Sequence, residues 1–146
     1  RSTGRKKKAE YPKVVIDSNV FISAVVFGGK PREVLNLGIE GEIRLAVSIE
    51  FLDEIRAVLR GKKFQYPTRV LYSIEKEIVA ISEIVDPHEE IQAIPEDPGD
   101  NRVLECAVES GSDYIITGDH HLLELSHFQD IRIVSPDDFL REYRKK

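Results

Sequence analysis

The stretch VVIDSNVFIS at residues 14–23 decides the fold prediction, because an apolar, β-branched run ends there in an aspartate and passes into a helical pattern. Runs of this kind are typical of strands that are buried on both faces of a parallel sheet. A second run, DYIIT at residues 113–117, leads through Gly118 into Asp119 in the same way. Strands that alternate with helices in this manner indicate a series of βαβ units.

The remaining sequence continues the alternation of strand and helix. Residues 86–99 contain three prolines and are predicted to be mostly loop. We expect one domain over residues 13–146, built as a parallel sheet with helices on both faces. The predicted strands are 13–17, 42–47, 113–117 and 131–135, with a further one possible at the end of 68–85, and the predicted helices are 18–27, 31–41, 48–60, 68–85, 100–111, a short one within 118–125, and 135–144.

Length and composition fit a small intracellular protein. The chain has 146 residues, 41% of them hydrophobic, and no apolar run reaches the roughly 18 residues that suggest a membrane span. The start of the sequence lacks the apolar segment of a signal peptide, so we expect a soluble, cytoplasmic protein with no membrane partner. The single cysteine, Cys106, excludes an internal disulfide and a zinc-finger framework, and it is predicted to pack in the core.

Charge is distributed unevenly along the chain. The net charge is −5, yet residues 1–13 and 141–146 are rich in Lys and Arg, which leaves a strongly acidic body between two basic ends. Residues 1–12 are predicted to form a basic tail that either contacts phosphates or is simply solvated. The acidic body argues against binding nucleic acid by bulk charge and fits a protein that gathers carboxylates around cations.

Three aspartates are predicted to converge at one edge of the sheet. Asp17 and Asp119 follow the two best strands, and Asp100 opens a helix after the proline-rich loop. Sites in open parallel sheets form at the carboxyl ends of the strands. Aspartate is also a good helix N-cap, so each of the three has capping as an alternative role. Asp97, in the same loop as Asp100, is either a turn residue or an additional ligand.

Glu54 is a fourth candidate because of its position on the predicted helix 48–60. It lies about 100° from the centre of that helix's apolar stripe, on the shoulder of the buried face. Asp53 and Glu50 lie farther round and are expected to face water. Glu54 is therefore the one acid of this helix that we expect to reach the site.

Four carboxylates in one place repel each other unless a cation compensates them. Oxygen ligands favour Mg²⁺ or Mn²⁺ over zinc, and such ions activate water and neutralise a phosphodiester in its transition state. The histidines do not suggest a zinc enzyme or an acid–base ribonuclease. His120 and His121 are adjacent, so their side chains are expected to diverge, and the HExxH spacing is absent.

Taken together, these motifs resemble the PIN-domain family. VVIDSNVFIS resembles the family's opening strand and acid, SIEFLDEIRAVL at residues 48–59 resembles its second acidic helix, and DPGDNRVLECAVESGSDYIITGDHHLL at residues 97–123 resembles its third and fourth acidic positions. The resemblance spans roughly residues 13–140. It matches the four acidic positions to Asp17, Glu54, Asp100 and Asp119.

The resemblance implies a three-layer α/β/α sandwich and hydrolysis of phosphodiester bonds with Mg²⁺ or Mn²⁺, usually in RNA. We therefore expect a nucleic-acid partner, single-stranded RNA. Ser18, Asn19 and Thr117 match polar positions beside the acids, where they would orient carboxylates or water. The chain departs from the family at His121, where close relatives often carry another aspartate.

Many stand-alone members of the family are toxins that an antitoxin protein holds inactive, and many are homodimers. The apolar stripe over residues 70–81 fits such a partner surface, and it fits core packing equally. Two alternatives to a nuclease are a non-catalytic module of the same fold that binds RNA or protein, and a phosphate-handling α/β protein. Four retained acids argue against the first, and the lack of a second acid two residues after Asp17 argues against the second.

Overall fold

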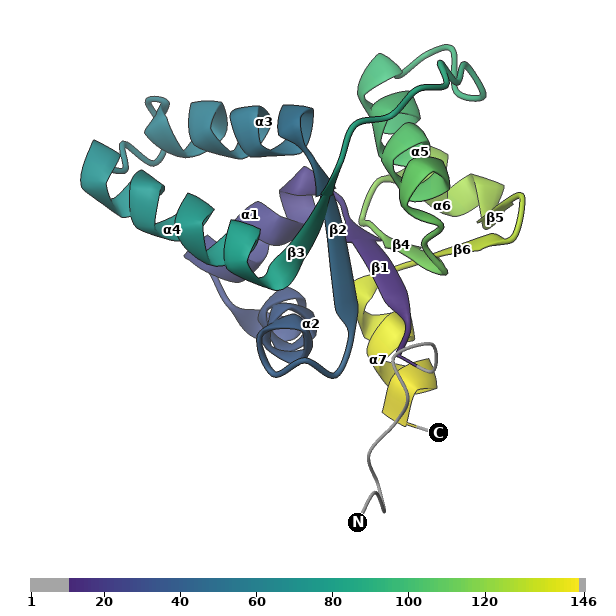
Figure 1. Ribbon diagram of the computed structural model, residues 1–146, viewed down its shortest axis with the longest axis horizontal. Helices are drawn as coiled ribbons and strands as arrows, with labels where there is room; N and C mark the ends of the chain where they lie inside the picture. Colours follow the sequence, from purple (N-terminus) through teal and green to yellow (C-terminus); the bar gives the residue numbers. More distant parts are fainter. Residues whose placement is uncertain (1–10, 145–146) are drawn as a thin grey trace.

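The computed structural model describes residues 11–144, which form a six-stranded sheet of order β3-β2-β1-β4-β6-β5 with helices on both faces (Figure 1). Most of the predicted basic tail, residues 1–12, therefore lies outside the described residues. The elements are β1 (Lys13–Ile16), α1 (Ser18–Val26), α2 (Gly29–Ile39), β2 (Arg44–Ser48), α3 (Ile49–Arg60), α4 (Thr68–Ile81), β3 (Ser82–Val85), α5 (Pro98–Ser110), β4 (Tyr114–Ile116), α6 (His120–Leu125), β5 (His127–Phe128), β6 (Ile131–Val134) and α7 (Pro136–Arg144).

The sheet is parallel except for its edge strand β5, which confirms the predicted mostly parallel architecture. β1 pairs in parallel with β2 and β4, β2 with β3, and β4 with β6. β5 pairs antiparallel with β6 and was not predicted. Its two residues are too short to show an alternating pattern, and they turn into β6 through Gln129 at φ 54°.

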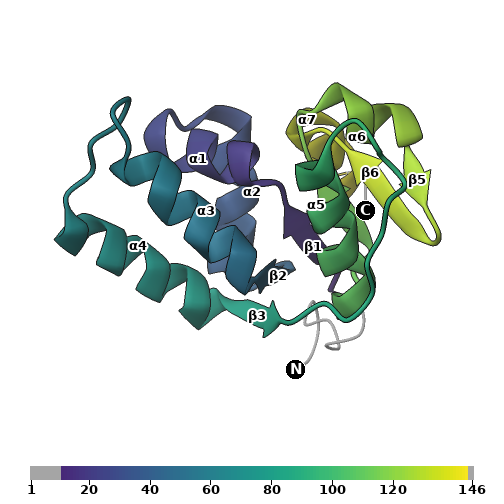
Figure 2. The same ribbon diagram turned by 90° about the horizontal axis from the view of Figure 1, so that it is seen from above.

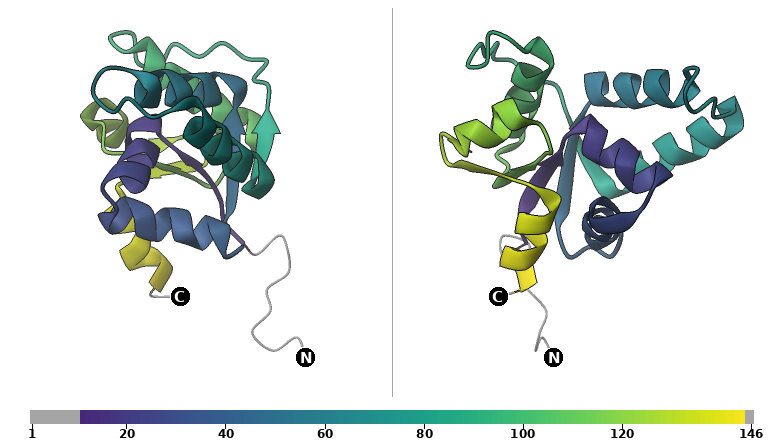
Figure 3. Two further views of the ribbon diagram at one scale, coloured as in Figure 1. Left: turned by 90° about the vertical axis from the view of Figure 1, so that its left-hand side faces the viewer. Right: turned by 180° about the vertical axis from the view of Figure 1, so that it is seen from behind.

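Alternate residues of the strands face two separate cores. Val14 and Ile16 pack with α1, α2, α3, α4 and α7, whereas Val15 packs with α5 and α6. Helices α1 to α4 lie on one side of the sheet, and α5 and α6 lie on the other (Figures 2 and 3). This division follows from the two-residue period of a strand. It confirms the three-layer arrangement. Cys106 belongs to the second core, as predicted, and burial raises the pKa of its thiol to about 12.

Two helices begin earlier than predicted. α2 begins at Gly29 rather than at Pro31, after a turn in which Gly28 and Gly29 have φ values of 86° and 68°. Such angles strain any residue with a Cβ, so glycine is required there. α5 begins at Pro98 rather than at residue 100, because the side chain of Asp97 caps it. Proline is well suited to this first helical position.

The helix over residues 68–81 buries its predicted stripe, which confirms core packing. Leu71 and Ile78 are 3% exposed, and Ile74 and Ile81 pack against the same core. The strand suggested at the end of this segment forms as β3. Among the described residues, no helix is both long and apolar enough to cross a membrane.

The loop before α5 is fastened to that helix. The side chain of Asn101 accepts a hydrogen bond from the backbone N–H of Ile94 at 2.8 Å and donates one to its carbonyl at 2.7 Å. The carboxylate of Glu105 accepts the N–H of Ile91 at 2.8 Å. Ile94 is 2% exposed. These bonds satisfy buried backbone groups and fix the position from which Asp97 and Asp100 project.

Candidate metal centre

Asp17 and Thr117 lie side by side because their strands are adjacent and in register. Ile16 of β1 pairs with Ile116 of β4, so the residues that follow meet at the carboxyl edge of the sheet. The fully buried hydroxyl of Thr117 donates a hydrogen bond to Asp17 Oδ2 at 2.7 Å. It also accepts the backbone N–H of Asp119 at 3.0 Å. One hydroxyl therefore orients the first acid and the loop that carries the fourth.

Asp119 stands at the start of α6 and acts as its N-cap. Its Oδ1 accepts the backbone N–H of His121 at 2.8 Å. Asp119 therefore has the capping role that is an alternative for each aspartate. Asp17 does not have this role, because its side chain makes no cap bond to α1. At α5 the cap is Asp97, whose Oδ1 accepts the N–H of Asp100 at 3.3 Å.

Asp100 is buried beside Asp119. Its side chain is 8% exposed, and a single oxygen atom from each of Asp97, Asp100 and Asp119 lies within 4.8 Å of the others and of a nitrogen of His121. The structure therefore brings together two of the four predicted acids and the additional candidate Asp97. Among the described residues, neither Asp17 nor Glu54 belongs to a set this tight.

The pKa values show the mutual repulsion of these acids. Burial first, and then the neighbouring carboxyl of Asp119, raise the pKa of Asp100 to about 8. Burial also raises the pKa of Asp17, and the charges of Glu54 and Asp119 add to that effect. Burial opposes the ionised form of Asp119 as well. There, however, the amide hydrogen bond from His121 and hydrogen bonding with Asp100 outweigh it, so the pKa is lowered. The two carboxyl groups therefore resist being ionised together in the absence of a cation.

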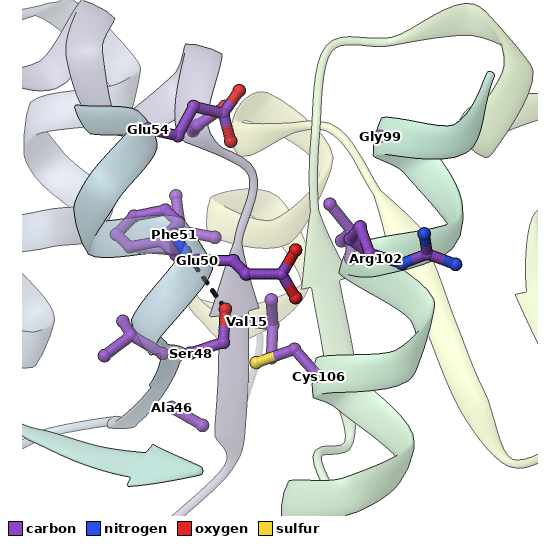
Figure 4. Close-up of a pocket in the computed structure, with 13 residues that line it drawn as sticks. Val15, Ala46, Ser48, Glu50, Phe51, Glu54, Gly99, Arg102 and Cys106 are labelled. Carbon is purple, nitrogen blue, oxygen red and sulfur yellow. Dashed lines mark hydrogen bonds between the residues drawn. The ribbon is translucent and has the colours of Figure 1, made fainter. Parts of the chain in front are cut away.

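Glu54 extends from α3 into a cleft that separates α3 from α5 (Figure 4). The cleft has a volume of about 260 Å³ and an apolar floor that includes Val15, Ala46 and Cys106. Glu54 is exposed, and its charge acts on Asp17. Glu50 is exposed, as predicted. It lines the same cleft one turn earlier and points towards α5.

Arg102 is the cation at the rim of this cleft. It forms a two-pronged ion pair with Glu105, with Nε–Oε1 at 2.7 Å and Nη2–Oε2 at 2.5 Å. That pairing raises the pKa of Arg102, and the charge of Glu50 contributes less. Its side chain is 36% exposed, so part of the guanidinium faces solvent. The sequence did not single out Arg102, because one arginine on a helix carries no motif.

The polar residues Ser18 and Asn19 line two different hollows. Ser18 is 4% exposed and lines the cleft beside Glu54. Asn19 is exposed and lines a second depression together with Asp119 and His120. Each hollow therefore includes one of the four predicted acids.

His121 also belongs to the acidic cluster. Its Nδ1 lies 3.6 Å from Asp119 Oδ1 and 3.9 Å from an oxygen of both Asp97 and Asp100. The expectation that the adjacent imidazoles diverge is wrong, since the rings of His120 and His121 lie 4.1 Å apart and are tilted by 39°. His121 lies two residues after Asp119, at the position where the sequence departs from the family pattern.

The donor groups at this edge fit a divalent cation. Asp100 Oδ2 and His121 Nδ1 are buried and have no hydrogen-bond partner within residues 11–144. Buried polar atoms are rarely left in this state without an ion or water to satisfy them. A cation between them would satisfy both and remove the repulsion among the carboxylates.

Comparison with known proteins assigns the fold. A PIN-domain family model matches residues 13–121. The chain belongs to the PIN-domain family. It is also 32% identical to Uncharacterized protein MJ1680 of Methanocaldococcus jannaschii, over 91% of this chain and 92% of that protein. PIN domains are typically nucleases that depend on divalent metals, and the acidic cluster of this PIN domain lies at the edge where parallel sheets form their sites.

Thr117 provides a first test of the PIN-domain centre. Replacing it with valine removes the hydroxyl but keeps the shape, and it leaves Asp17 Oδ2 and the Asp119 N–H without their present partner. We expect Thr117→Val to lose about 1–3 kcal/mol of stability and roughly 10-fold in Mn²⁺ affinity. Denaturant unfolding and calorimetric titration measure the two effects. Thr117→Ser keeps the hydroxyl and should behave like the wild type; equal behaviour of Thr117→Val would contradict this role.

Proposed function

We propose that the chain is a metal-dependent endoribonuclease in which Asp17, Glu54, Asp100 and Asp119 hold Mg²⁺ or Mn²⁺. The observation that carries the proposal is the buried, unpartnered oxygen of Asp100 beside Asp119 at the carboxyl edge of the sheet. We further propose that residues 13–146 form one nuclease domain.

The chain's own residues prepare the site for this chemistry. A divalent ion there would supply positive charge to the phosphodiester and make a nearby water more acidic. Thr117 fixes one oxygen of Asp17, and α6 fixes one oxygen of Asp119, so the carboxylates are oriented before a substrate arrives. Glu54 is exposed and makes no side-chain hydrogen bond or ion pair within residues 11–144, so it can adjust to the ligand.

The shape of the surface supports an extended single strand as the substrate. One hollow is lined by Glu54 and another by Asp119, so a chain bound at the acids has depressions into which it can extend. The cleft offers the half-buried ring of Phe51 and the guanidinium of Arg102. Aromatic side chains and cations are the groups on which unpaired nucleotides bind.

The toxin role and the homodimer are predictions from the family resemblance. The feature that bears on both is an apolar groove of about 390 Å³ between α1, α2 and α4. Ile39 lines it and is 48% exposed. Exposed apolar grooves are common sites of partner binding, so an antitoxin or a second copy of the chain is the partner we expect there.

The experiment that tests the nuclease is cleavage of a mixed, labelled single-stranded RNA pool by wild type and Asp17→Asn, with Mn²⁺, Mg²⁺ or EDTA. We expect cutting with metal, no cutting in EDTA, and none by the variant. A duplex of the same sequences should be cut much more slowly. Absence of both cutting and metal binding would favour the non-catalytic binding module.

A further inference from the structure

His121 occupies the position from which a fourth ligand would complete the cluster. Its Nδ1 is nearly equidistant from Asp97, Asp100 and Asp119, at 3.6 to 3.9 Å. We propose that His121 Nδ1 and Asp97 Oδ2 are metal ligands together with Asp100 and Asp119, and that this mixed donor set selects Mn²⁺ over Mg²⁺. The inference rests on the proposed metal-dependent function and gives the preference of the site between its two candidate ions.

Two buried, unpartnered atoms face the same point. Asp100 Oδ2 and His121 Nδ1 lack hydrogen-bond partners among the described residues, although both are shielded from solvent. They are 3.9 Å apart, too far to bond each other. One ion bound to both atoms explains why neither the carboxylate oxygen nor the imidazole nitrogen has a hydrogen-bond partner.

Asp97 and His121 are held so that their remaining donor atoms are free. Asp97 uses Oδ1 to cap α5, which leaves Oδ2 directed at His121 from 3.9 Å. The backbone N–H of His121 is bound to Asp119 Oδ1, and its ring is packed against that of His120. The start of α5 holds Asp97, and the start of α6 holds His121. The folded chain therefore fixes both donor atoms before an ion binds.

The donor types decide which ion is preferred. Mg²⁺ requires a nearly ideal octahedron of oxygen ligands and keeps several waters. Imidazole nitrogen is a softer donor that first-row transition ions accept more readily, and the affinity of nitrogen- and oxygen-based sites for these ions rises from Mn²⁺ onwards. An aspartate at position 121 would give an all-oxygen set. Histidine there shifts the preference of the centre from Mg²⁺ to Mn²⁺.

A different role for His121 predicts the opposite result. As an imidazolium, His121 would be a counter-ion to the three carboxylates and would compete with the metal. Removing it would then strengthen metal binding. As a ligand, it contributes a bond to the ion, and its removal weakens Mn²⁺ binding by about 10-fold or more.

The test is pulsed EPR of bound Mn²⁺, with calorimetric titration of Mn²⁺ and Mg²⁺. The variants are His121→Asp, His121→Ala and His120→Ala in the full chain. We expect ¹⁴N coupling to Mn²⁺ in wild type and His120→Ala, and none in the two His121 variants. We expect His121→Asp to lose Mn²⁺ affinity by about 10-fold while Mg²⁺ affinity holds or rises. Thermal unfolding in EDTA verifies that the variants fold.

The wild-type spectrum decides the matter independently of any variant. Bound Mn²⁺ without ¹⁴N coupling would overturn the inference and leave the proposed nuclease intact. Loss of the ¹⁴N coupling in His120→Ala would show that His120 is the ligand in place of His121, and would overturn the inference. Tighter Mn²⁺ binding by His121→Ala would make His121 the counter-ion. Failure of the wild type to bind either ion would overturn the proposed function itself.

Discussion

Asp100→Asn is expected to lower the metal-dependent cleavage rate by about 10³-fold, a loss of roughly 4 kcal/mol of transition-state stabilisation. The amide keeps the shape of the side chain but removes the buried charge that faces the cluster. Single-turnover cleavage of labelled RNA at saturating Mn²⁺ measures the effect. Asp130→Asn is the matched control, because Asp130 is exposed in the turn before β6, at the opposite edge of the sheet. Equal rates for wild type and Asp100→Asn would contradict the assignment.

Asp100→Asn should also stabilise the metal-free protein against unfolding, and the size of this stabilisation should depend on pH. Because the pKa of Asp100 is raised to about 8 in the folded state, this group favours folding at low pH. That contribution is lost as the pH rises from about 4 towards 8, since the unfolded chain ionises more easily. Asparagine does not ionise. In EDTA we therefore expect Asp100→Asn to unfold several degrees above wild type at pH 8 and close to it at pH 4.

Glu54→Gln is expected to lower cleavage by about 10²-fold, whereas Glu50→Gln should change it little. Both glutamates are exposed, lie one turn apart on α3 and line the same cleft. They differ in the group on which their charge acts: Glu54 acts on Asp17, and Glu50 acts on Arg102. The pair therefore separates a ligand at the metal centre from a charge on the wall of the cleft.

The measurement is again single-turnover cleavage, with Mn²⁺ titrated from limiting to saturating concentration. Glu54→Gln should need more Mn²⁺ to reach half of its maximal rate. An equal loss in both variants would show that the cleft requires negative charge in general. A larger loss in Glu50→Gln would transfer the ligand role to Glu50.

The parts of the centre that the sequence predicts are those set by local pattern. VVI and YII are buried strands whose aspartates must emerge at one edge, and Figure 1 shows the two strands as neighbours in the sheet. The family resemblance supplies Thr117, and the register of β1 and β4 explains its contact with Asp17. The continuous apolar run in β1 also predicts two covered faces, which the separate cores confirm.

The parts that the sequence does not predict depend on how side chains turn once elements pack. Glu50 is exposed, as its angle on the helix predicts, but the pattern does not show that α5 forms a wall opposite it. The pattern leaves Asp97 as either a turn residue or an additional ligand. In the structure its Oδ1 caps α5, and its Oδ2 faces His121. The contact between the two imidazoles depends on their side-chain torsions, which the sequence pattern does not predict.

Anomalous diffraction at the manganese absorption edge, from crystals soaked in Mn²⁺, tests directly whether Asp100 and Asp119 bind a divalent ion. We expect a strong peak between their carboxylates, within bonding distance of both. We also expect the peak to be lost in Asp100→Asn crystals soaked in the same way. Manganese peaks only at other acidic surfaces, with none at this edge of the sheet, would contradict the proposed metal centre.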